Sequence, residues 1–346
     1  MLIFIFGIFF DYMNRRGKYM SIDKQGSGTA PLVSVYCMTY NQEKTVAQAI
    51  ESVVSQKTDF AFELIVHDDA STDSTADIIK EYARRYPGIV RPVFQTENRY
   101  REHNIIYEYM HPISKGRFIA LCEGDDYWSD PEKLSIQTRI MLDNPDCTLS
   151  FHAVNQLAAD GTVSAFRPLK KSGEVPAPLI VKRGGMFCPT VSLMFRRDIL
   201  DSWPDFRAAA DVYDYPLQVL AAASGKVIYT DRIMGVYRFA SEGSWTSMHL
   251  NEVDFGHIEN ETVWLTMFDR YTGGRFSQEI NFHMAHIWLT EYRKTLEPRI
   301  RRRAGGYIRQ LPLRERLLFN FTFAFFSVFG KTADRLFGFI KKRLLK

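Results

Sequence analysis

The chain has 346 residues, 46% of them hydrophobic and 24% charged, with a formal net charge of +4. This length and composition are typical of a globular protein with one large domain, or of a domain with an appendage. Four widely spaced cysteines, Cys37, Cys122, Cys147 and Cys188, form no C-x-x-C pair. Their spacing argues against a disulfide framework and a structural zinc site, and predicts reduced thiols in a cytoplasmic protein.

Positive charge is concentrated at the C-terminal end. Residues 299–346 contain 13 Lys and Arg against two acids, so the rest of the chain carries a formal charge of −7. The apolar run at 317–329 is too short and too interrupted to predict a membrane-spanning helix. Its basic and aromatic surroundings predict a tail helix on the inner face of the cytoplasmic membrane. The alternative is a terminal helix that packs on the domain. We predict no nucleic-acid partner.

The first ten residues are almost wholly apolar. They lack a basic leading region and a small-residue cleavage site, so they do not predict a secretory signal. Ten residues are also too few to span a bilayer. Either this segment is translated, or Met20 is the physiological start.

Strand and helix patterns alternate through the first part of the chain. In order, we expect a strand at 33–38, a helix at 46–56, a strand at 62–66, a helix ending near 86, a strand at 90–94, a helix at 104–115 and a strand at 118–122. This alternation predicts a mostly parallel sheet.

The pattern then becomes less regular. We expect a helix starting at Asp130, a strand at 147–154, a loop or hairpin at 158–182, a strand at 189–195, a helix at 214–223 and short strands at 227–229 and 233–237. After Trp245 we expect helices at 251–271 and 278–295.

Two of the predicted strands run directly into acidic residues. The acids are Asp68 and Asp69 after the strand at 62–66, and Glu123, Asp125 and Asp126 after the strand at 118–122. In an open α/β sheet, ligands bind outside the carboxyl ends of the strands, so both clusters can reach one crevice. Carboxylates in such a place suit a divalent metal and a phosphorylated ligand.

Other motifs accompany these acids in a fixed order. They are VYCMTYNQE at 35–43, DDASTD at 68–73, GR at 116–117, EGDDYW at 123–128, DYPL at 214–217 and VYR at 236–238. Together they resemble family 2 glycosyltransferases of the bacterial surface-polysaccharide type. The resemblance implies a GT-A (Rossmann-like) α/β domain at 31–245 with a mostly parallel central sheet, after a lead-in at 1–30 and before a helical C-terminal extension at 246–346.

Enzymes of this family move a sugar from a nucleotide diphosphate donor to an acceptor hydroxyl, with inversion at the anomeric carbon. The resemblance implies a hexosyl- or N-acetylhexosaminyl-transferase with a nucleotide-sugar donor, and a pyrimidine-binding carboxylate favours UDP. A glycan or lipid-linked saccharide, such as a capsule or lipopolysaccharide precursor, is the expected acceptor.

The resemblance also implies a divalent cation, Mn²⁺ or Mg²⁺, with Asp125 as its direct ligand. Glu123 occupies a position that is usually Asp in the family, so it would act through water or the ribose. Asp126 either belongs to the nucleotide-sugar site or caps the following turn.

The nucleoside is expected to lie between the loop after the strand at 33–38 and the loop after the strand at 62–66. Asp69 is the candidate for hydrogen bonding to the base, while Asp68 either joins it or caps the next helix. Thr39, Tyr40 and Glu43 are expected to frame the nucleoside.

An inverting transfer needs a base near the acceptor, which typically contributes about 10²- to 10⁴-fold in rate. Asp214 matches the position of the acidic residue that serves as this base in the family. The alternatives are Asp211 as the base, or Asp214 as a helix cap. Arg238 is the candidate diphosphate contact. The family often has a histidine where this chain has Ala240, so either Arg238, or Ser241 and Ser244, would take its role, or the metal dependence is weaker than usual. Trp245 would either close over the donor or simply pack in its loop.

Two other classes compete with this hypothesis. A sugar-1-phosphate nucleotidyltransferase needs a glycine-rich phosphate loop, and none follows Val33. A non-catalytic subunit that binds a glycan or a partner transferase is the second alternative, and the combination of Asp69, Asp125 and Asp214 argues against it.

Overall fold

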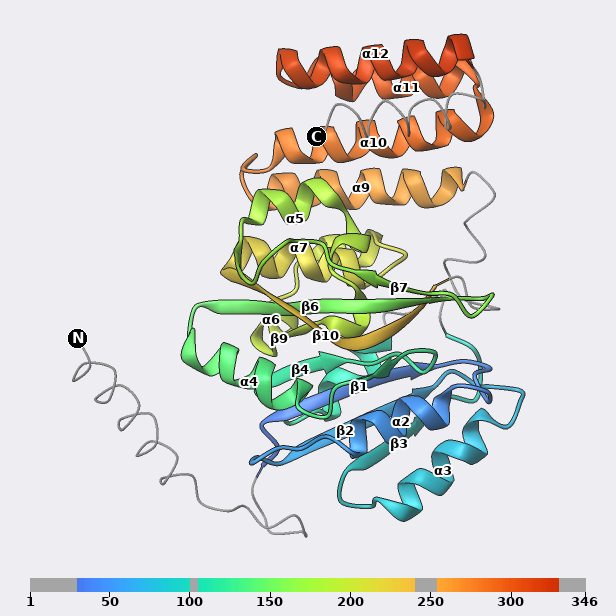
Figure 1. Ribbon diagram of the computed structural model, residues 1–346, viewed down its shortest axis with the longest axis vertical. Coiled ribbons are helices and arrows are strands. Elements are labelled where there is room, and N and C mark those ends of the chain that lie inside the picture. The colour runs from blue at the N-terminus through green and yellow to red at the C-terminus, as the bar shows by residue number, and fades with distance from the viewer. Residues whose placement is uncertain (1–29, 100–104, 240–253, 330–346) are drawn as a thin grey trace, which may run out of the picture.

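The computed structural model describes residues 30–99, 105–239 and 254–329, and Figure 1 shows their arrangement. The predictions for Met20, Ala240, Ser241, Ser244 and Trp245 lie outside these residues. The described strands are β1 (Val33–Thr39), β2 (Phe62–Asp68), β3 (Val90–Phe94), β4 (Phe118–Leu121), β5 (Tyr127–Trp128), β6 (Cys147–Ala158), β7 (Val163–Phe166), β8 (Gly173–Val175), β9 (Met194–Arg196) and β10 (Lys226–Phe239).

Helices pack around this sheet and extend from it towards the C-terminal end. They are α2 (Val46–Val54), α3 (Thr75–Arg85), α4 (Lys133–Asp143), α5 (Ala177–Arg183), α6 (Asp198–Asp201), α7 (Asp214–Ser224), α9 (Phe255–Tyr271), α10 (Ser277–Thr295), α11 (Pro298–Arg309) and α12 (Leu313–Phe329). In Figure 1, helices α9 to α12 are stacked at one end of the molecule, with α11 and α12 farthest from the sheet.

The sheet has the order β3-β2-β1-β4-β9-β6-β10-β5, with β7 paired to β6 and β8 to β10. Strands β3, β2, β1 and β4 are parallel neighbours, and β6 is parallel to β10. The antiparallel pairs all involve the short strands β5, β7, β8 and β9. The predicted α/β class with a mostly parallel central sheet is therefore confirmed.

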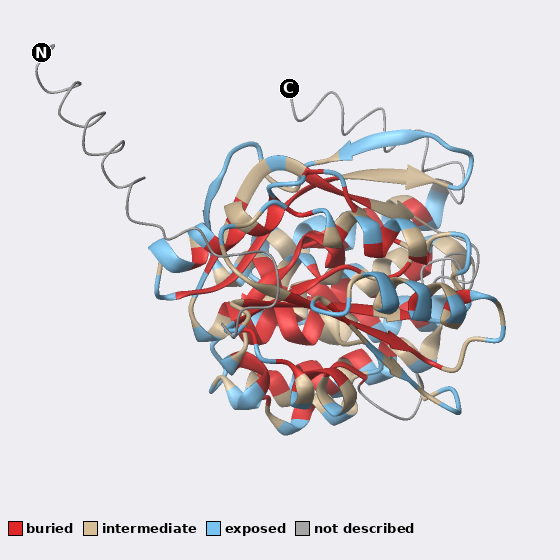
Figure 2. Cartoon of the chain, turned by 90° about the horizontal axis from the view of Figure 1, so that it is seen from below, coloured by how far each residue is buried: buried red, intermediate tan, exposed pale blue. Residues whose placement is uncertain are grey.

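The sheet separates two apolar clusters because successive strand side chains point to opposite faces. In β1, Val33, Val35 and Cys37 pack with α2, whereas Tyr36 faces the other cluster. That second cluster continues from the sheet through α7 and α9 to Phe326 of α12. Figure 2 shows buried residues concentrated along the strands and the helix faces turned towards them. The C-terminal helices thus share a core with the sheet.

Several predicted elements differ from the structure. In the described part of the expected helix at 104–115, a π-helical turn at Ile106–Met110 leads into a 3-10 turn at His111–Ile113, which contains Pro112. Proline removes a backbone donor, so the regular pattern cannot continue. Of the expected strand at 189–195, only its end belongs to β9, and a 3-10 turn at Thr190–Ser192 precedes it.

The C-terminal half is more regular than expected. The two short strands predicted at 227–229 and 233–237 form the single strand β10, whose register with β6 shifts between Thr230 and Gly235. Helix α11 was not predicted. No helix within the described ranges is long and apolar enough to cross a membrane. All four cysteines are buried and free.

Truncating Phe268 of α9 to alanine should lower the free energy of unfolding by about 3–5 kcal/mol. This side chain is fully buried and packs 5.7 Å from the ring of Phe206, which precedes α7. Val263→Ala on the same helix is the control, because Val263 is 51% exposed and should change stability by less than about 0.5 kcal/mol. Denaturant unfolding checks both. Equal stabilities would contradict a core shared with the C-terminal helices.

Candidate active site

Three loops that carry predicted site residues meet at one edge of the sheet. Thr39, the last residue of β1, lies opposite Asp68 of β2, and the N–H of Asp69 donates to the Thr39 carbonyl at 3.0 Å. Beyond β4, the N–H of Gly124 donates to the Met38 carbonyl at 3.0 Å. The two acidic clusters therefore flank the end of β1.

Gly124 permits this close approach of the acidic loop to β1. A Cβ atom at Gly124 would lie 2.2 Å from Oε1 of Gln42 and 2.6 Å from Cγ2 of Thr39. A larger residue would displace these two side chains or move the loop of Glu123 and Asp125 away from the strand ends.

Several of the predicted nucleoside residues are held by hydrogen bonds within and between the loops that follow β1 and β2. Asp68 is 2% exposed, and its carboxylate accepts from the N–H and the hydroxyl of Ser71 at 3.2 and 2.5 Å. It also accepts from the Thr39 hydroxyl at 3.3 Å. Glu43 accepts the N–H of Ser74, next to the start of α3, at 3.1 Å. These contacts stabilise the loops. Asp68 does not cap α3, the alternative considered for it, because its carboxylate bonds to Ser71 and the residue before α3 is Ser74.

Asp69 and Tyr40, in the same two loops, differ in their exposure to solvent. The Asp69 carboxylate accepts the N–H of Arg99 at 2.8 Å, although the residue is only 2% exposed. Tyr40 is 47% exposed, so its ring lies open beside these loops. An exposed aromatic ring beside a buried carboxylate can stack on a base while the carboxylate accepts from it.

In the second acidic loop, Asp126 points inward. It is fully buried; Oδ1 accepts the N–H of Arg238 at 2.8 Å, while Oδ2 has no hydrogen-bond partner among the described residues. Burial, followed by the charges of Asp125 and Glu123, raises the pKa of Asp126 well above its usual range. Asp126 thus connects the loop to β10 rather than capping a turn towards solvent.

Arg238 links β10 to the same loop. Its guanidinium donates to the Asp125 carbonyl and to the side chain of Gln48, and it lies 5.1 Å from the centre of the Tyr127 ring. The Arg238 guanidinium therefore lies at the acidic loop, where it could bind a diphosphate.

Glu123 connects the acidic loop to α7. It accepts the hydroxyl of Tyr213 at 2.5 Å, and Tyr213 immediately precedes Asp214. Burial and then the charge of Asp125 raise the pKa of Glu123 to about 8, and Asp214 adds to this while the Tyr213 hydrogen bond opposes it. Tyr213 was not among the predicted site residues, although it lies next to Asp214 in the sequence.

Asp214 begins α7, as predicted, and is partly buried. One carboxylate oxygen accepts the N–H of Tyr215 at 2.8 Å, and the other accepts the hydroxyl of Thr190 at 3.1 Å. Burial raises the pKa of Asp214, while these two hydrogen bonds oppose the rise. The rival Asp211 instead lies 2.8 Å from Nδ1 of His257 on α9. A carboxylate with a raised pKa is a stronger base, as proton abstraction at neutral pH requires.

The acid cluster fits a divalent cation. Within residues 30–99, 105–239 and 254–329, no three His, Cys, Asp or Glu side chains are grouped so as to hold a metal alone. However, burial raises the pKa of Glu123 and of Asp126, and the charge of Asp125 raises both further, which indicates a local deficit of positive charge. A hard cation with one carboxylate ligand, completed by phosphate oxygens and water, suits such a site.

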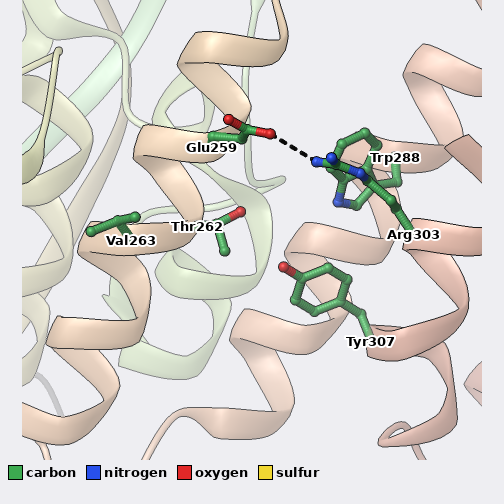
Figure 3. A pocket seen from close by; sticks show the side chains of 6 residues that line it. All are labelled: Glu259, Thr262, Val263, Trp288, Arg303 and Tyr307. Carbon is green, nitrogen blue, oxygen red and sulfur yellow. Dashed lines mark hydrogen bonds and ion pairs between the residues drawn. The ribbon is translucent and has the colours of Figure 1, made fainter.

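A separate groove of about 420 Å³ lies between α9, α10 and α11, and Figure 3 shows its lining. Arg303 pairs with Glu259 at 2.9 Å, and its guanidinium lies 5.5 Å from the centre of the Trp288 ring. None of the predicted site residues lines this groove.

Comparison with known proteins shows the family and the fold of the chain. Residues 34–203 match the family described as "Glycosyl transferase family 2". The chain is 33% identical over 267 residues to the uncharacterized protein Rv1520 of Mycobacterium tuberculosis, covering 76% of this chain and 75% of the relative. It is 32% identical over 151 residues to the "Putative teichuronic acid biosynthesis glycosyltransferase TuaG" of Bacillus subtilis, covering 43% of this chain and 55% of TuaG.

Among solved structures, S. aureus TarS 1-349 in complex with UDP-GlcNAc superimposes with a TM-score of 0.63. The alignment covers 88% of this chain and 91% of TarS at 17% sequence identity, which supports a common fold. The chain belongs to glycosyltransferase family 2 and has the GT-A fold.

Replacing Asp68 with alanine should lower the free energy of unfolding by about 1–3 kcal/mol, because the N–H and the hydroxyl of the half-buried Ser71 lose their acceptor. Asp77→Ala on α3 is the control, since Asp77 makes only an exposed ion pair with Lys80 and should cost under about 1 kcal/mol. Thermal and denaturant unfolding measure both. A stable Asp68→Ala protein with weakened nucleotide binding would assign Asp68 to the ligand instead.

Proposed function

We propose that this family 2 enzyme transfers a hexosyl or N-acetylhexosaminyl group from a UDP-sugar to a glycan or lipid-linked acceptor in surface-polysaccharide synthesis. The observation that carries the proposal is the meeting of Asp69, the Glu123–Asp126 loop and Asp214 around the end of β1 and the start of α7. The names of TuaG, with its teichuronic acid, and of the TarS complex, with its UDP-GlcNAc, support the substrate classes.

On the donor side, Asp69 binds the base, and Thr39, Tyr40 and Glu43 frame the nucleoside. Asp125 would hold Mn²⁺ or Mg²⁺, which would neutralise charge on the diphosphate leaving group. Arg238, already at this loop, adds a second cation, and Glu123 acts through water or the ribose.

On the acceptor side, Asp214 removes the proton of the attacking hydroxyl. The oxygen forms its bond to the anomeric carbon as the bond to the diphosphate breaks, and that electron pair leaves with the diphosphate. Thr190 holds the base in place through the hydrogen bond to its carboxylate.

The test is release of nucleotide diphosphate from a panel of nucleotide sugars with Mn²⁺ or Mg²⁺. Asp214→Asn should lower release by about 10²- to 10⁴-fold while donor binding, measured by calorimetry, is retained. Asp125→Asn should lower both release and metal-dependent binding of UDP.

Asp205→Asn is the matched control, because Asp205 is exposed near α7 but outside the site. Full activity of Asp214→Asn would reject this residue as the base. If no donor is turned over and calorimetry detects no nucleotide, a non-catalytic subunit becomes the better hypothesis.

We further propose that α12 brings the enzyme to the cytoplasmic membrane surface. Phe319 and Phe323 pack on α10, at ring distances of 5.1 Å from Phe282 and Tyr292. The opposite face carries exposed apolar side chains at helical spacing: Leu313, Leu317, Leu318, Phe321 and Val328, each 57–75% exposed. One face thus packs on the domain, while the other is available to lipid.

Positively charged side chains near this apolar face support lipid as its binding partner. Arg301 and Arg302 of α11 are exposed, and Arg301 donates to Ser327 of α12 at 3.4 Å. Basic side chains beside an exposed apolar face favour an anionic leaflet. This placement would also bring the site to a lipid-linked acceptor.

The double variant Leu317→Glu/Phe321→Glu should reduce co-sedimentation with anionic phosphatidylglycerol vesicles at least about 10-fold, since each side chain contributes about 1.5–3 kcal/mol when buried. Leu142→Glu on α4, an exposed leucine outside this face, should bind like the wild type. Unchanged sedimentation, or a change in oligomeric size by gel filtration instead, would contradict lipid binding by α12.

A further inference from the structure

A chain of acidic and histidine side chains connects the loop before α7 to helices α9 and α10. His257 Nδ1 lies 2.8 Å from Oδ2 of Asp211, and its Nε2 lies 3.7 Å from Oε2 of Glu261. The other oxygen of Glu261 lies 2.8 Å from Nε2 of His283. Glu261 and His283 are each only 7% exposed. Burying such groups is unfavourable unless they are paired, so their pairing fixes the relative positions of α9 and α10.

This chain of contacts ends against the first turn of α7. The ring of His283 packs 5.1 Å from the ring of Tyr215, whose hydroxyl donates to the Val181 carbonyl at 2.6 Å. Gly184 has a positive φ of 77°, and a Cβ atom there would lie 2.5 Å from Cε1 of His283. The imidazole is therefore enclosed between Gly184 and Tyr215. Tyr215 in turn follows Asp214 and donates its backbone N–H to that carboxylate.

We propose that Glu261 and His283 are positioning residues of the active site, which hold the first turn of α7, and thereby the carboxylate of Asp214, towards the acceptor. This inference rests on the proposed role of Asp214 as the base. Residues 34–203 match the family, whereas Asp214, Glu261 and His283 all follow that segment. The second half of the chain would therefore complete the catalytic site as well as the core.

The same contacts act on the strength of the base. Glu261 is faced by His257 on its own helix with Asp211 behind it, by His283 from α10, and by Tyr215 and Asp214 from α7. Asp214 is also faced by Glu123, Cys188 and Thr190. After burial, which is the main cause, the charge of Glu261 further raises the pKa of Asp214. Removing that charge would make Asp214 a weaker base.

Glu261→Gln tests this with little change in shape. With the donor found by nucleotide release, the plateau rate should fall about 10-fold, and the acid limb of kcat/KM should move to lower pH because the pKa of Asp214 falls. Nucleotide affinity should stay unchanged. Glu259→Gln is the control two residues away, where the carboxylate is exposed and pairs with Arg303. An unchanged rate, or a lower rate with an unmoved acid limb, would overturn the proposal.

His283 provides a second pair of variants. His283→Gln can still donate a hydrogen bond to Glu261 and should retain more activity than His283→Ala, whereas equal activities would contradict the positioning role. Failure of the two proposals can be told apart. An active Asp214→Asn enzyme rejects the proposed base, while an inactive Asp214→Asn with a wild-type Glu261→Gln rejects only the positioning residues.

Discussion

The candidate active site depends on a cluster of negatively charged side chains that lie close together. Burial raises the pKa of Glu123 and of Asp126; the charges of Asp125 and Asp214 raise the pKa of Glu123 further, and those of Asp125 and Glu123 raise the pKa of Asp126 further. Such a group is stable only where hydrogen bonds and cations compensate it. Tyr213 donates to Glu123, Thr190 donates to Asp214, and Arg238 donates to Asp126 through its backbone and to the Asp125 carbonyl through its side chain. A divalent cation bound here would supply the positive charge that these groups do not.

The fold supplies this cluster from distant parts of the sequence. Parallel strands place the loops after β1, β2 and β4 at one edge, and α7 approaches them with Asp214 at its first position. Helices α9 and α10 then pack behind α7 through Trp264, Tyr215 and His283, whose rings are in contact. The helical C-terminal region is therefore continuous with the site on one side and, at α12, carries an exposed apolar face on the other.

Local patterns were sufficient to predict most of the sheet and the position of the acids. Strand β3 has the predicted bounds, and Asp214 begins a helix as expected, because short apolar runs and helix starts are determined locally. Tertiary partners decide the rest. The sequence could not reveal that Tyr213 would reach Glu123, 90 residues away, or that Asp211 would turn to His257. Nor could it show that Asp68 would close its own loop through Ser71 rather than cap the next helix, the alternative that was considered.

The most direct test of the account is a crystal structure with UDP and Mn²⁺ bound, with the metal located by its anomalous scattering. The account predicts one nucleotide at the ends of β1, β2 and β4, with its base against Asp69 and the manganese bound by Asp125. Nucleotide and metal found elsewhere, for example in the groove lined by Trp288 and Tyr307, would contradict it.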